Sequence, residues 1–419
     1  MTAALPVVAP RAGLAGWSLF AALIAMAGLP IYIHAPKFYV DSYGVSLAAL
    51  GGVLALLRLF DVVQDPVLGW LAEVGRAQRG LWVAISAALM ALAMIGLFAM
   101  APPIAPLLWF ALTLSVLFTA FSFLTIVFYA EGVAKAATLG PNGHVRLAGW
   151  REGGSLLGVC LAAVAPVALA ALSPQPFAAF ALGFAVLAVL AVWAMSREWT
   201  GGGAPAGSPL ALFRPVLADP LARRLLLIAL LNAAPVAVTS TLFLFFVESR
   251  LAAPGMEGPL LLLFFLAAAI STPIWSRLAQ RHGLRPVLLA GMGLAILSFL
   301  WAATLGAGDT LAFAVICAAS GAALGADMVL LPAIFARRLA HLGQGGEGAA
   351  FGLWSFVSKL SLALAAATLL PALDAAGFVP GAQNAPSALA ALSVFYALVP
   401  CALKVLAIAL LAITKIPEV

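Results

Sequence analysis

Long runs of apolar residues, separated by short polar or glycine- and proline-containing turns, dominate the whole chain. Each run is at least as long as the roughly 17 to 25 residues that an α-helix needs to cross the hydrocarbon core of a bilayer. Twelve runs follow one another, with cores that begin near Leu14, Leu47, Leu81, Leu107, Leu147, Phe177, Leu225, Leu260, Val287, Leu311, Phe351 and Leu389. The pattern predicts an all-α polytopic membrane protein with twelve transmembrane helices.

One long polar interval, from Ser196 to Leu225, divides these runs six and six. Its middle, Gly201–Pro209, has the Gly, Ala, Ser and Pro composition that is typical of a flexible linker. We therefore expect residues 1–196 to form an N-terminal six-helix bundle, residues 197–224 to form a cytoplasmic linker, and residues 225–419 to form a C-terminal six-helix bundle.

The two halves resemble each other weakly. A shift of 207 residues superposes Pro66 on Pro273 and Leu71 on Leu278, and a short basic turn follows each pair. Parallel repeats of six helices with a substrate site between them are the architecture of major facilitator transporters. The repeat therefore predicts two pseudo-symmetric bundles.

Composition and charge support a membrane location. Of the 419 residues, 65% are hydrophobic and 9% are charged, which is too few polar residues to cover the surface of a soluble domain. Alternate loops carry sixteen of the 21 Lys and Arg residues on one side and two on the other. This positive-inside asymmetry predicts cytoplasmic termini in a bacterial inner membrane, and it argues against a nucleic-acid partner.

Three charged residues in the run that begins at Leu47 are the strongest chemical signal. Arg58 and Asp61 are three residues apart, and Asp61 and Asp65 are four apart, so all three project from one face of a helix. Charged side chains are expected inside a membrane only where they face protein or a water-filled path. We expect Asp61 and Asp65 to bind a cation, with Arg58 in their charge network; a structural ion pair is the alternative.

The internal repeat supplies a control for this assignment. The 207-residue shift places Asp61 on Ala268 and Asp65 on Thr272. The fold can therefore be built without carboxylates at these positions, which favours a chemical purpose for them.

Oxygen-bearing side chains also line one face of the run that begins at Leu107. Ser122, Thr125 and Tyr129 are spaced three and four residues apart. Na⁺ is bound by oxygen ligands, whereas a proton needs only a carboxylate of suitable pKa. We expect Ser122 and Thr125 to join the cation site, although such hydroxyls commonly bond the carbonyl four residues back in their own helix.

Lys359 is the second strong signal. It lies about two turns inside the run that begins at Phe351, which is deeper than a lysine reaches comfortably from the membrane surface. A buried ammonium needs a partner, and Asp61 or Asp65 across the cavity is the expected one.

Three further charges are weaker candidates. Arg151 lies about one turn inside its run, where it either faces the cavity or extends to the cytoplasmic surface. Asp327 lies deep in the tenth run and is taken as a substrate-binding candidate. Lys404 is expected to be structural, with its amine reaching the cytoplasmic interface.

Several segments resemble one known family. Phe38–Asp41, Tyr43–Ser46 and Arg58–Gly69 closely resemble the helix 1 to 2 signature of the glycoside-pentoside-hexuronide:cation symporters, the melibiose-carrier branch of the major facilitator superfamily. Arg146–Arg151 resembles the start of helix 5 in that family. Gly346–Gly348, Phe351–Gly352 and Lys359 resemble its helix 11.

The resemblance implies cation-coupled uptake, with Asp61 and Asp65 in the cation site and Thr125 at a position shared by cation and sugar. It also implies that Tyr129, Arg151 and Lys359 lie near the substrate. The helix-4 position that is acidic in the melibiose carrier is Thr125 here, and the helix-1 carboxylate falls near Ala25, which argues against a galactoside.

The loop signature of the superfamily is also present in degenerate form, in Gly69–Arg76 and Leu278–Arg285. We expect these loops and their neighbours to form a cytoplasmic gate that contains Glu73, Arg76, Arg146, Arg281 and Arg337. The acidic pair that follows helix 10 in the family is replaced by Arg337 and Arg338.

These observations predict a secondary active transporter that couples Na⁺ or H⁺ to symport of a sugar or related small solute by alternating access. We expect a monomer in the bilayer, with no cofactor and no metal beyond Na⁺. A carrier of amphiphilic or other non-sugar solutes, such as lysolipids, is the alternative. A receptor or an enzyme is less favoured, because the four His, at 34, 144, 282 and 341, lack ligand spacing.

Overall fold

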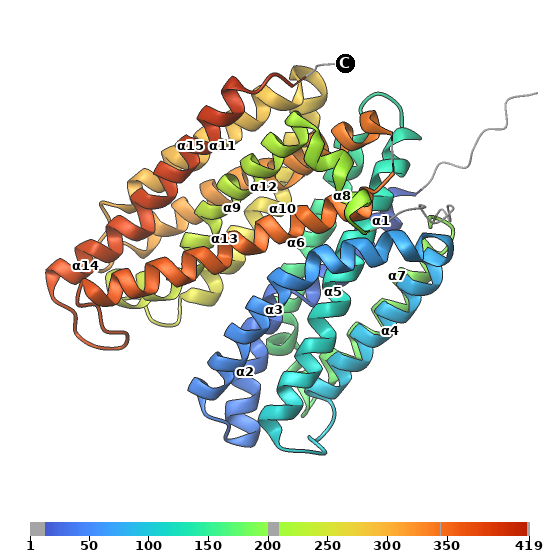
Figure 1. The fold of residues 1–419 in the computed structure, drawn as a ribbon. Coiled ribbons are helices and arrows are strands. Elements are labelled where there is room, and N and C mark those ends of the chain that lie inside the picture. The colour runs from blue at the N-terminus through green and yellow to red at the C-terminus, as the bar shows by residue number, and fades with distance from the viewer. Residues whose placement is uncertain (1–12, 200–208, 344, 417–419) are drawn as a thin grey trace, which may run out of the picture.

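The computed structural model describes residues 13–199, 209–343 and 345–416, and these described residues are helical almost throughout and contain no strand. The first half of the chain folds into one bundle and the second half into another (Figure 1). The first bundle comprises α1 (Leu14–Met26), α2 (Leu29–Tyr43), α3 (Leu47–Val74), α4 (Arg79–Phe98), α5 (Pro106–Ala137), α6 (Gly143–Leu169) and α7 (Pro176–Met195). The second comprises α9 (Pro220–Phe245), α10 (Glu257–His282), α11 (Leu284–Ala302), α12 (Thr310–Leu342), α13 (Glu347–Ala375), α14 (Pro386–Ser393) and α15 (Val399–Ile413).

The described helices account for twelve membrane crossings, as the sequence predicts. Ten segments are long and apolar enough to span a bilayer, and one of them, Ala48–Phe98, contains both α3 and α4 around a short 3₁₀ turn. At 51 residues this segment is twice the length of one crossing. The first crossing is broken between α1 and α2 at Gly28, directly before the Leu29–Pro30 pair that starts α2.

Only part of the predicted linker, residues 197–199 and 209–224, is among the described residues. Residues 200–208, which include most of the glycine-rich stretch, and Arg11 lie outside the described residues. The interval that was expected to be linker nevertheless contains a helix, α8 (Pro209–Ala218), whose Val216 is buried and which contacts α9 and α13. An apolar face that can pack on a neighbour explains why this part of the interval is helical.

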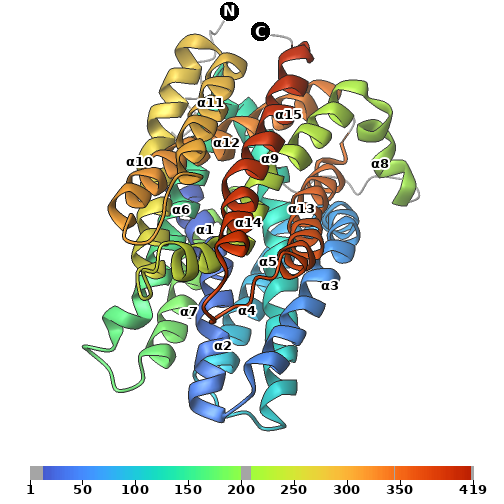
Figure 2. The ribbon, with the colours of Figure 1, turned by 90° about the vertical axis from the view of Figure 1, so that its left-hand side faces the viewer.

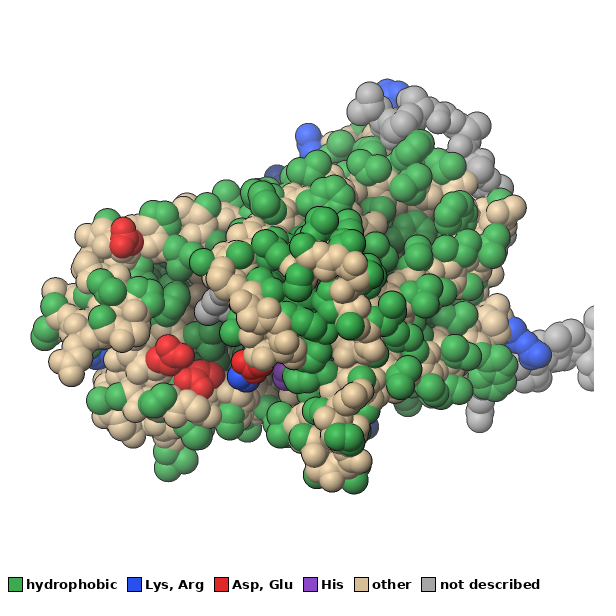
Figure 3. Space-filling view, turned by 90° about the horizontal axis from the view of Figure 1, so that it is seen from below, with side chains coloured by type: hydrophobic (Ala, Val, Ile, Leu, Met, Phe, Trp, Pro, Cys, Tyr) green, Lys and Arg blue, Asp and Glu red, His purple; other side chains and the backbone are tan. Residues whose placement is uncertain are grey.

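The outer surface of both bundles is apolar. Large hydrophobic side chains are exposed along the crossing helices, among them Val63 of α3, Trp193 of α7 and Leu297 of α11. Figure 3, a view from below, shows hydrophobic side chains spread over the visible face among backbone and other side chains, with few charged ones. Such a surface is stable in lipid, where helices satisfy their own backbone groups.

The chain starts α1 and finishes α15 at the same end of the molecule (Figure 2). We call this end the basic end. The turns between α3 and α4, α5 and α6, α10 and α11, and α12 and α13 all lie there, because the crossings alternate in direction. Arginines lie in or close to these turns: Arg76, Arg79, Arg146, Arg281, Arg285, Arg337 and Arg338.

Two helix crossings hold the bundles together near the basic end. α3 meets α13 where Gly69 faces Gly348: a Cβ on Gly69 would lie 2.7 Å from the Gly348 carbonyl oxygen. α6 meets α10 where Gly149 and Gly153 face Ser276 and Thr272, with hydroxyl oxygens 3.0 and 3.1 Å from the position of a Cβ. Glycine permits this close approach of the two backbones at the α3–α13 crossing, and at the α6–α10 crossing it leaves room for the two hydroxyls.

These two crossings are equivalent under the sequence repeat. The 207-residue shift that superposes the halves also places Asp65 on Thr272. Thr272 lies against Gly153 of α6, and Asp65 lies against Gly352 of α13, with its carbonyl oxygen 2.8 Å from where a Cβ would stand on that glycine. The structure therefore supports the weak repeat and identifies α3 with α10, and α13 with α6.

Candidate functional site between α3, α5 and α13

The candidate site lies where α3 and α5 of the first bundle meet α13 of the second. α3 begins at Ser46, whose hydroxyl caps the helix by accepting a hydrogen bond from the amide of Ala49. Asp61 and Asp65 lie in the middle of this helix and are one turn apart. Asp65 is fully buried and Asp61 is 6% exposed, so both face protein and neither faces lipid.

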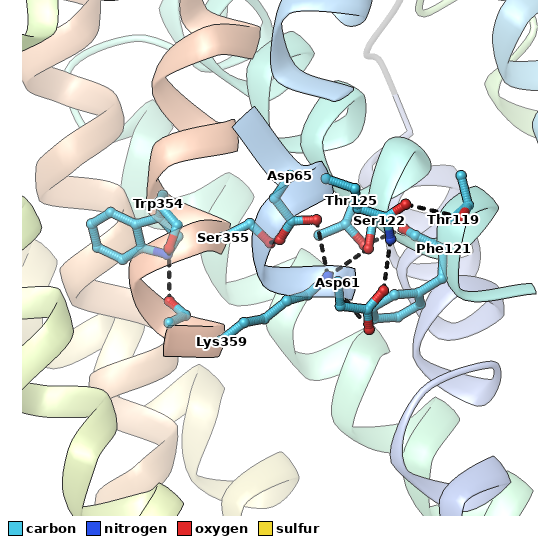
Figure 4. Close-up of polar contacts among 11 residues, drawn as sticks. Asp61, Asp65, Thr119, Phe121, Ser122, Thr125, Trp354, Ser355 and Lys359 are labelled. Atoms are coloured by element: carbon cyan, nitrogen blue, oxygen red, sulfur yellow. Dashed lines mark hydrogen bonds and ion pairs between the residues drawn. The ribbon is translucent and has the colours of Figure 1, made fainter. Parts of the chain in front are cut away.

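Lys359 of α13 joins the two carboxylates across the bundle interface (Figure 4). Its amine lies 3.0 Å from Asp65 Oδ1 and 3.9 Å from Asp61 Oδ2. It also donates a hydrogen bond to Ser122 Oγ of α5, at 2.6 Å. The structure thus brings together the four residues that the sequence singled out on three different helices.

The remaining carboxylate oxygens are also satisfied. Ser355 Oγ donates to Asp65 Oδ2 at 2.5 Å, and Gln64 Nε2 donates to Asp61 Oδ1 at 2.6 Å. Thr119 Oγ1 donates in turn to Gln64 Oε1, at 3.0 Å. Every acidic oxygen of the site therefore has a partner, as buried polar groups require.

The charges of the site do not cancel within this group. Two carboxylates face one ammonium, and Arg58, half-buried one turn before Asp61, is the next basic side chain on α3. Carboxylates this close are held together in a buried site only by positive charge or by a proton. The carboxylate and hydroxyl oxygens are the ligand types that suit Na⁺ or a proton. Among the described residues, no cluster of three or more His, Cys, Asp or Glu could hold a metal ion.

Of the two hydroxyls expected on α5, Ser122 and Thr125 behave differently. Ser122 faces the site and accepts the bond from Lys359, whereas Thr125 Oγ1 donates to the Phe121 carbonyl of its own helix at 2.7 Å. Thr125 still lies beside the site in Figure 4 and keeps its oxygen lone pairs free to accept.

A second polar cluster lies further along α5. Arg151 Nε and Tyr129 Oη both donate to Glu152 Oε1 at 2.7 Å, and the guanidinium carbon lies 3.6 Å above the Tyr129 ring. Arg151 and Glu152 are 4% and 1% exposed, so Arg151 does not extend to the surface. The ring of Tyr129 contacts Phe351 of α13, with centroids 5.3 Å apart.

The two clusters are neighbours on the same helices. Tyr129 follows Ser122 by two turns of α5, which is about 10 Å along the helix axis. Phe351 precedes Lys359 by a similar distance on α13. α13 is therefore in contact with both polar clusters, from the side of the opposite bundle.

Asp327 does not belong to this site. It lies in α12, and the Lys404 amine of α15 forms a hydrogen-bonded ion pair with it; the same amine donates to Asn232 Oδ1 of α9 at 2.7 Å. All three helices are in the second bundle. The expectation that Lys404 reaches the interface is wrong: the residue is 4% exposed, because a carboxylate lies within its reach inside the bundle.

Two of the five expected gate residues connect the bundles. Glu73 is fully buried and its Oε1 accepts a hydrogen bond from the Gly348 amide of α13 at 2.5 Å. Arg76 Nη1 lies 3.5 Å from Glu73 Oε2 and 3.3 Å from Glu347 Oε2. A carboxylate and an arginine from α3 and the turn after it thus hold the start of α13 at the basic end.

The other three expected gate residues lie elsewhere at that end. Arg146 donates to the Leu139 carbonyl within its own bundle, and Arg281 is exposed. Arg337 lines a cavity between the bundles. None of the three has a described contact with the Glu73 group.

Several site residues were not predicted. Ser355 could have been found, because it lies four residues before Lys359 on one helix face. Gln64 lies three residues after Asp61 on the same helix face, so it could have been found in the same way. The pair of Arg79 and Glu131, 2.6 Å apart and buried in the first bundle, joins residues 52 positions apart, and helical spacing gives no signal for it.

Comparison with known proteins bears on the family and the fold. The family described as MFS/sugar transport protein matches residues 14–418. The fold is similar to the crystal structure of a bacterial homologue of the iron transporter ferroportin in an outward-facing state, with 15% identity, a TM-score of 0.72, and coverage of 95% of this chain and 98% of that one. The same homologue with soaked iron gives 16% identity and a TM-score of 0.69 at the same coverage.

Proposed function

The chain belongs to the MFS/sugar transport protein family, and from this premise we propose that it carries a sugar or a related small polar solute across the membrane together with Na⁺ or H⁺. The protein is a membrane transporter and not an enzyme. The coupling ion and the substrate class are what the proposal adds.

The observation that carries the proposal is the position of Lys359 between Asp65 and Asp61. Its ammonium occupies the place that a coupling cation would take among the carboxylates. When Na⁺ or a proton binds, the attraction that holds Lys359 weakens, and α13 loses an ionic contact with α3. Cation binding would in this way change the contact between the two bundles.

The second cluster suits a polar substrate. A guanidinium, a carboxylate and a phenol hydroxyl, as in Arg151, Glu152 and Tyr129, are groups that hydrogen-bond sugar hydroxyls. In the present arrangement these groups satisfy one another, with Arg151 and Glu152 buried and Tyr129 partly buried. We propose that substrate replaces some of their mutual bonds when α13 and its Phe351 move away.

The basic end is the closed end of the transport path in this proposal. The glycine crossings and the bonds from Glu73 and Arg76 to α13 join the bundles there. By the positive-inside rule we expect that end to face the cytoplasm. These contacts would separate when the transporter opens inward.

Gradient-driven uptake tests the function. Vesicles that contain the purified protein are given either an inward Na⁺ gradient or an inward pH gradient, and uptake of labelled sugars, organic acids and other small polar solutes is measured. We expect accumulation of one solute class above equilibrium under one of the two gradients. Uptake that only equilibrates under both gradients contradicts cation coupling.

One observation favours a second candidate, a carrier of amphiphiles such as lysolipids. An apolar groove of about 610 Å³ lies over α3, α4 and α5, and it is lined by Phe60, Trp82 and Phe123. Thr119, which also lines the groove, bonds Gln64 of the cation site. A thermal-shift screen of sugars against lysolipids separates the two candidates, since only the true substrate class should stabilise the protein.

A further inference from the structure

A cavity of about 190 Å³ lies between the two bundles at the basic end. The start of α6 lines one side of it with Asn142 and His144. The junction of α10 and α11 lines the other side with Gly283 and Arg285, and Arg337 of α12 completes the wall. The cavity is separate from the ionic site of Asp61, Asp65 and Lys359.

Two helices begin at this cavity. α6 starts at Gly143 and α11 starts at Leu284, and neither Asn142 nor Gly283 supplies a side-chain cap. Gly283 has a φ of 87°, which lets α10 turn directly into α11 and aims the new helix start at the cavity. The amino ends of helices carry unpaired N–H groups and partial positive charge, so both ends attract an anion.

Two arginines, Arg285 and Arg337, add to this positive field. Arg285, Arg337 and His144 all line the cavity, and no described residue that lines it is acidic. Arg285 Nε and His144 Nδ1 are buried without a hydrogen-bond partner among the described residues. Arg285 is held in place from its other side, because its Nη2 donates to the Ala412 carbonyl of α15.

We propose that this cavity binds a phosphate group, supplied either by free phosphate or by a phospholipid headgroup. A tetrahedral oxyanion can accept bonds from several donors at once, and arginine is suited to bidentate contact with it. The bound group links α6 of the first bundle to α11 and α12 of the second. It thereby supplies negative charge between the bundles at the end where Arg337 and Arg338 stand.

One competitor for the same place is part of the chain itself. Ile416 lines the cavity, and Glu418, which lies outside the described residues, follows it by two positions. Its carboxylate is a single planar group, whereas the cavity collects donors from two helix starts and three side chains. A phosphate group uses more of these donors, and for that reason we favour it.

The first test uses inorganic phosphate on the purified full chain after its lipid has been removed. Thermal unfolding is followed against phosphate concentration at constant ionic strength, with chloride as the reference anion. We expect saturable stabilisation by phosphate. The double variant Arg285→Gln/Arg337→Gln should weaken the apparent affinity by about tenfold or more, because it removes two charge-assisted contacts.

The matched control is Arg224→Gln, an exposed arginine at the start of α9 that does not line the cavity. It should keep the phosphate effect unchanged. If the double variant does not elute as a monodisperse protein, the single variant His144→Leu is used, and a lower affinity for phosphate is again expected because it removes a hydrogen-bond donor from the cavity wall.

The second test identifies the source of the phosphate. The chain is reconstituted in vesicles of phosphatidylglycerol or phosphatidylcholine, and lipid that remains bound after extraction is measured by native mass spectrometry. Retained phospholipid that is lost in the arginine variant assigns the site to a headgroup; stabilisation by free phosphate alone assigns it to the ion. Either result supports the site.

Two results overturn the proposal. One is that phosphate and both lipids act equally on wild type and on the arginine variant. The other is that phosphate binds only after Glu418→Gln, which shows that the chain's own carboxylate fills the cavity. Neither depends on solute uptake, so this proposal and the proposed transport function fail independently.

Discussion

Lys359 of α13 lies 3.0 Å from Asp65 of α3, so the second bundle supplies the counter-charge for a fully buried carboxylate of the first. The equivalent position in the other crossing of the bundles is uncharged, because Thr272 takes the place of Asp65 there. The ionic contact is thus found at the crossing of α3 and α13 and not at the equivalent crossing of α10 and α6. Two helices can therefore cross in this way without it.

Replacing Asp61 by Asn should abolish gradient-driven accumulation and leave the protein folded, because the amide keeps the shape of the side chain and removes the charge that binds the cation. Uptake in vesicles and thermal unfolding are measured together. Asp41→Asn is the matched control, since Asp41 forms an exposed pair with Lys37 far from the site. Accumulation to the wild-type level by Asp61→Asn contradicts the assignment.

Replacing Lys359 by Gln should destabilise the protein in Na⁺-free buffer by about 3 to 5 kcal/mol, the typical cost of leaving buried charges without their partner. Thermal unfolding measures the effect. The double variant Lys359→Gln/Asp65→Asn removes one of the two carboxylates and should recover most of the loss. If Lys359→Gln leaves the unfolding midpoint unchanged, the ionic contact does not stabilise the folded protein.

The pair of Asp327 and Lys404 should be structural and should not contact substrate. Lys404→Met alone leaves Asp327 buried without its ammonium and should lower stability by about 3 to 5 kcal/mol. Lys404→Met combined with Asp327→Leu should restore stability and retain transport. If the double variant is as stable as wild type but no longer carries solute, Asp327 belongs to the substrate path.

Gly69→Ala should weaken the crossing of α3 and α13, because its Cβ would lie 2.7 Å from the Gly348 carbonyl. Overpacking of this kind costs about 1 to 3 kcal/mol. Gly51→Ala in the same helix is the control, since no atom lies within 4 Å of its Cβ position. A lower unfolding midpoint for Gly69→Ala alone is expected, and equal midpoints for the two variants would argue that the bundles are not in close contact here.

Asp219 should make stability depend on pH in the acidic range. Its hydrogen bonds from Arg338 hold the pKa of the carboxyl below its usual value, and the Ala222 amide of α9 acts in the same direction. The stabilisation is fully present above the unfolded-state pKa of about 3.9 and is lost as pH falls through the lower folded-state pKa.

Thermal unfolding between pH 3 and 6 measures this contribution. Asp219→Ser keeps a helix cap for α9 but loses the charge pair, so its unfolding midpoint should fall less steeply as the solution is acidified. An identical pH dependence in wild type and variant shows that Asp219 has an ordinary pKa in the folded protein.

Helical spacing explains why the central site could be found in the sequence. Asp61 and Asp65 share a face because they are four residues apart, and a lysine two turns inside a membrane helix needs an acidic partner. With few acids available inside the membrane, the pairing with Lys359 follows. The structure brings these residues together as expected, while their roles in cation binding remain proposals.

The same reasoning fails where the answer depends on which helices are neighbours. Lys404 and Asp327 lie 77 positions apart, and nothing in their spacing shows that α15 and α12 pack together. Arg151 likewise has two options in the sequence, and only its burial against Tyr129 and Glu152 shows that it does not extend to the surface. The sequence does not predict helix α8, because the glycine-rich stretch beside it makes the whole interval resemble a flexible linker.

α13 contacts both polar clusters, through Lys359 at one and Phe351 at the other. A ligand that displaces this helix from either cluster must therefore change its contact with the second. By thermodynamic reciprocity, the factor by which a bound cation improves solute affinity equals the factor by which bound solute improves cation affinity. In the proposed co-transport cycle, α13 is therefore the helix through which the cation site and the solute site would affect each other.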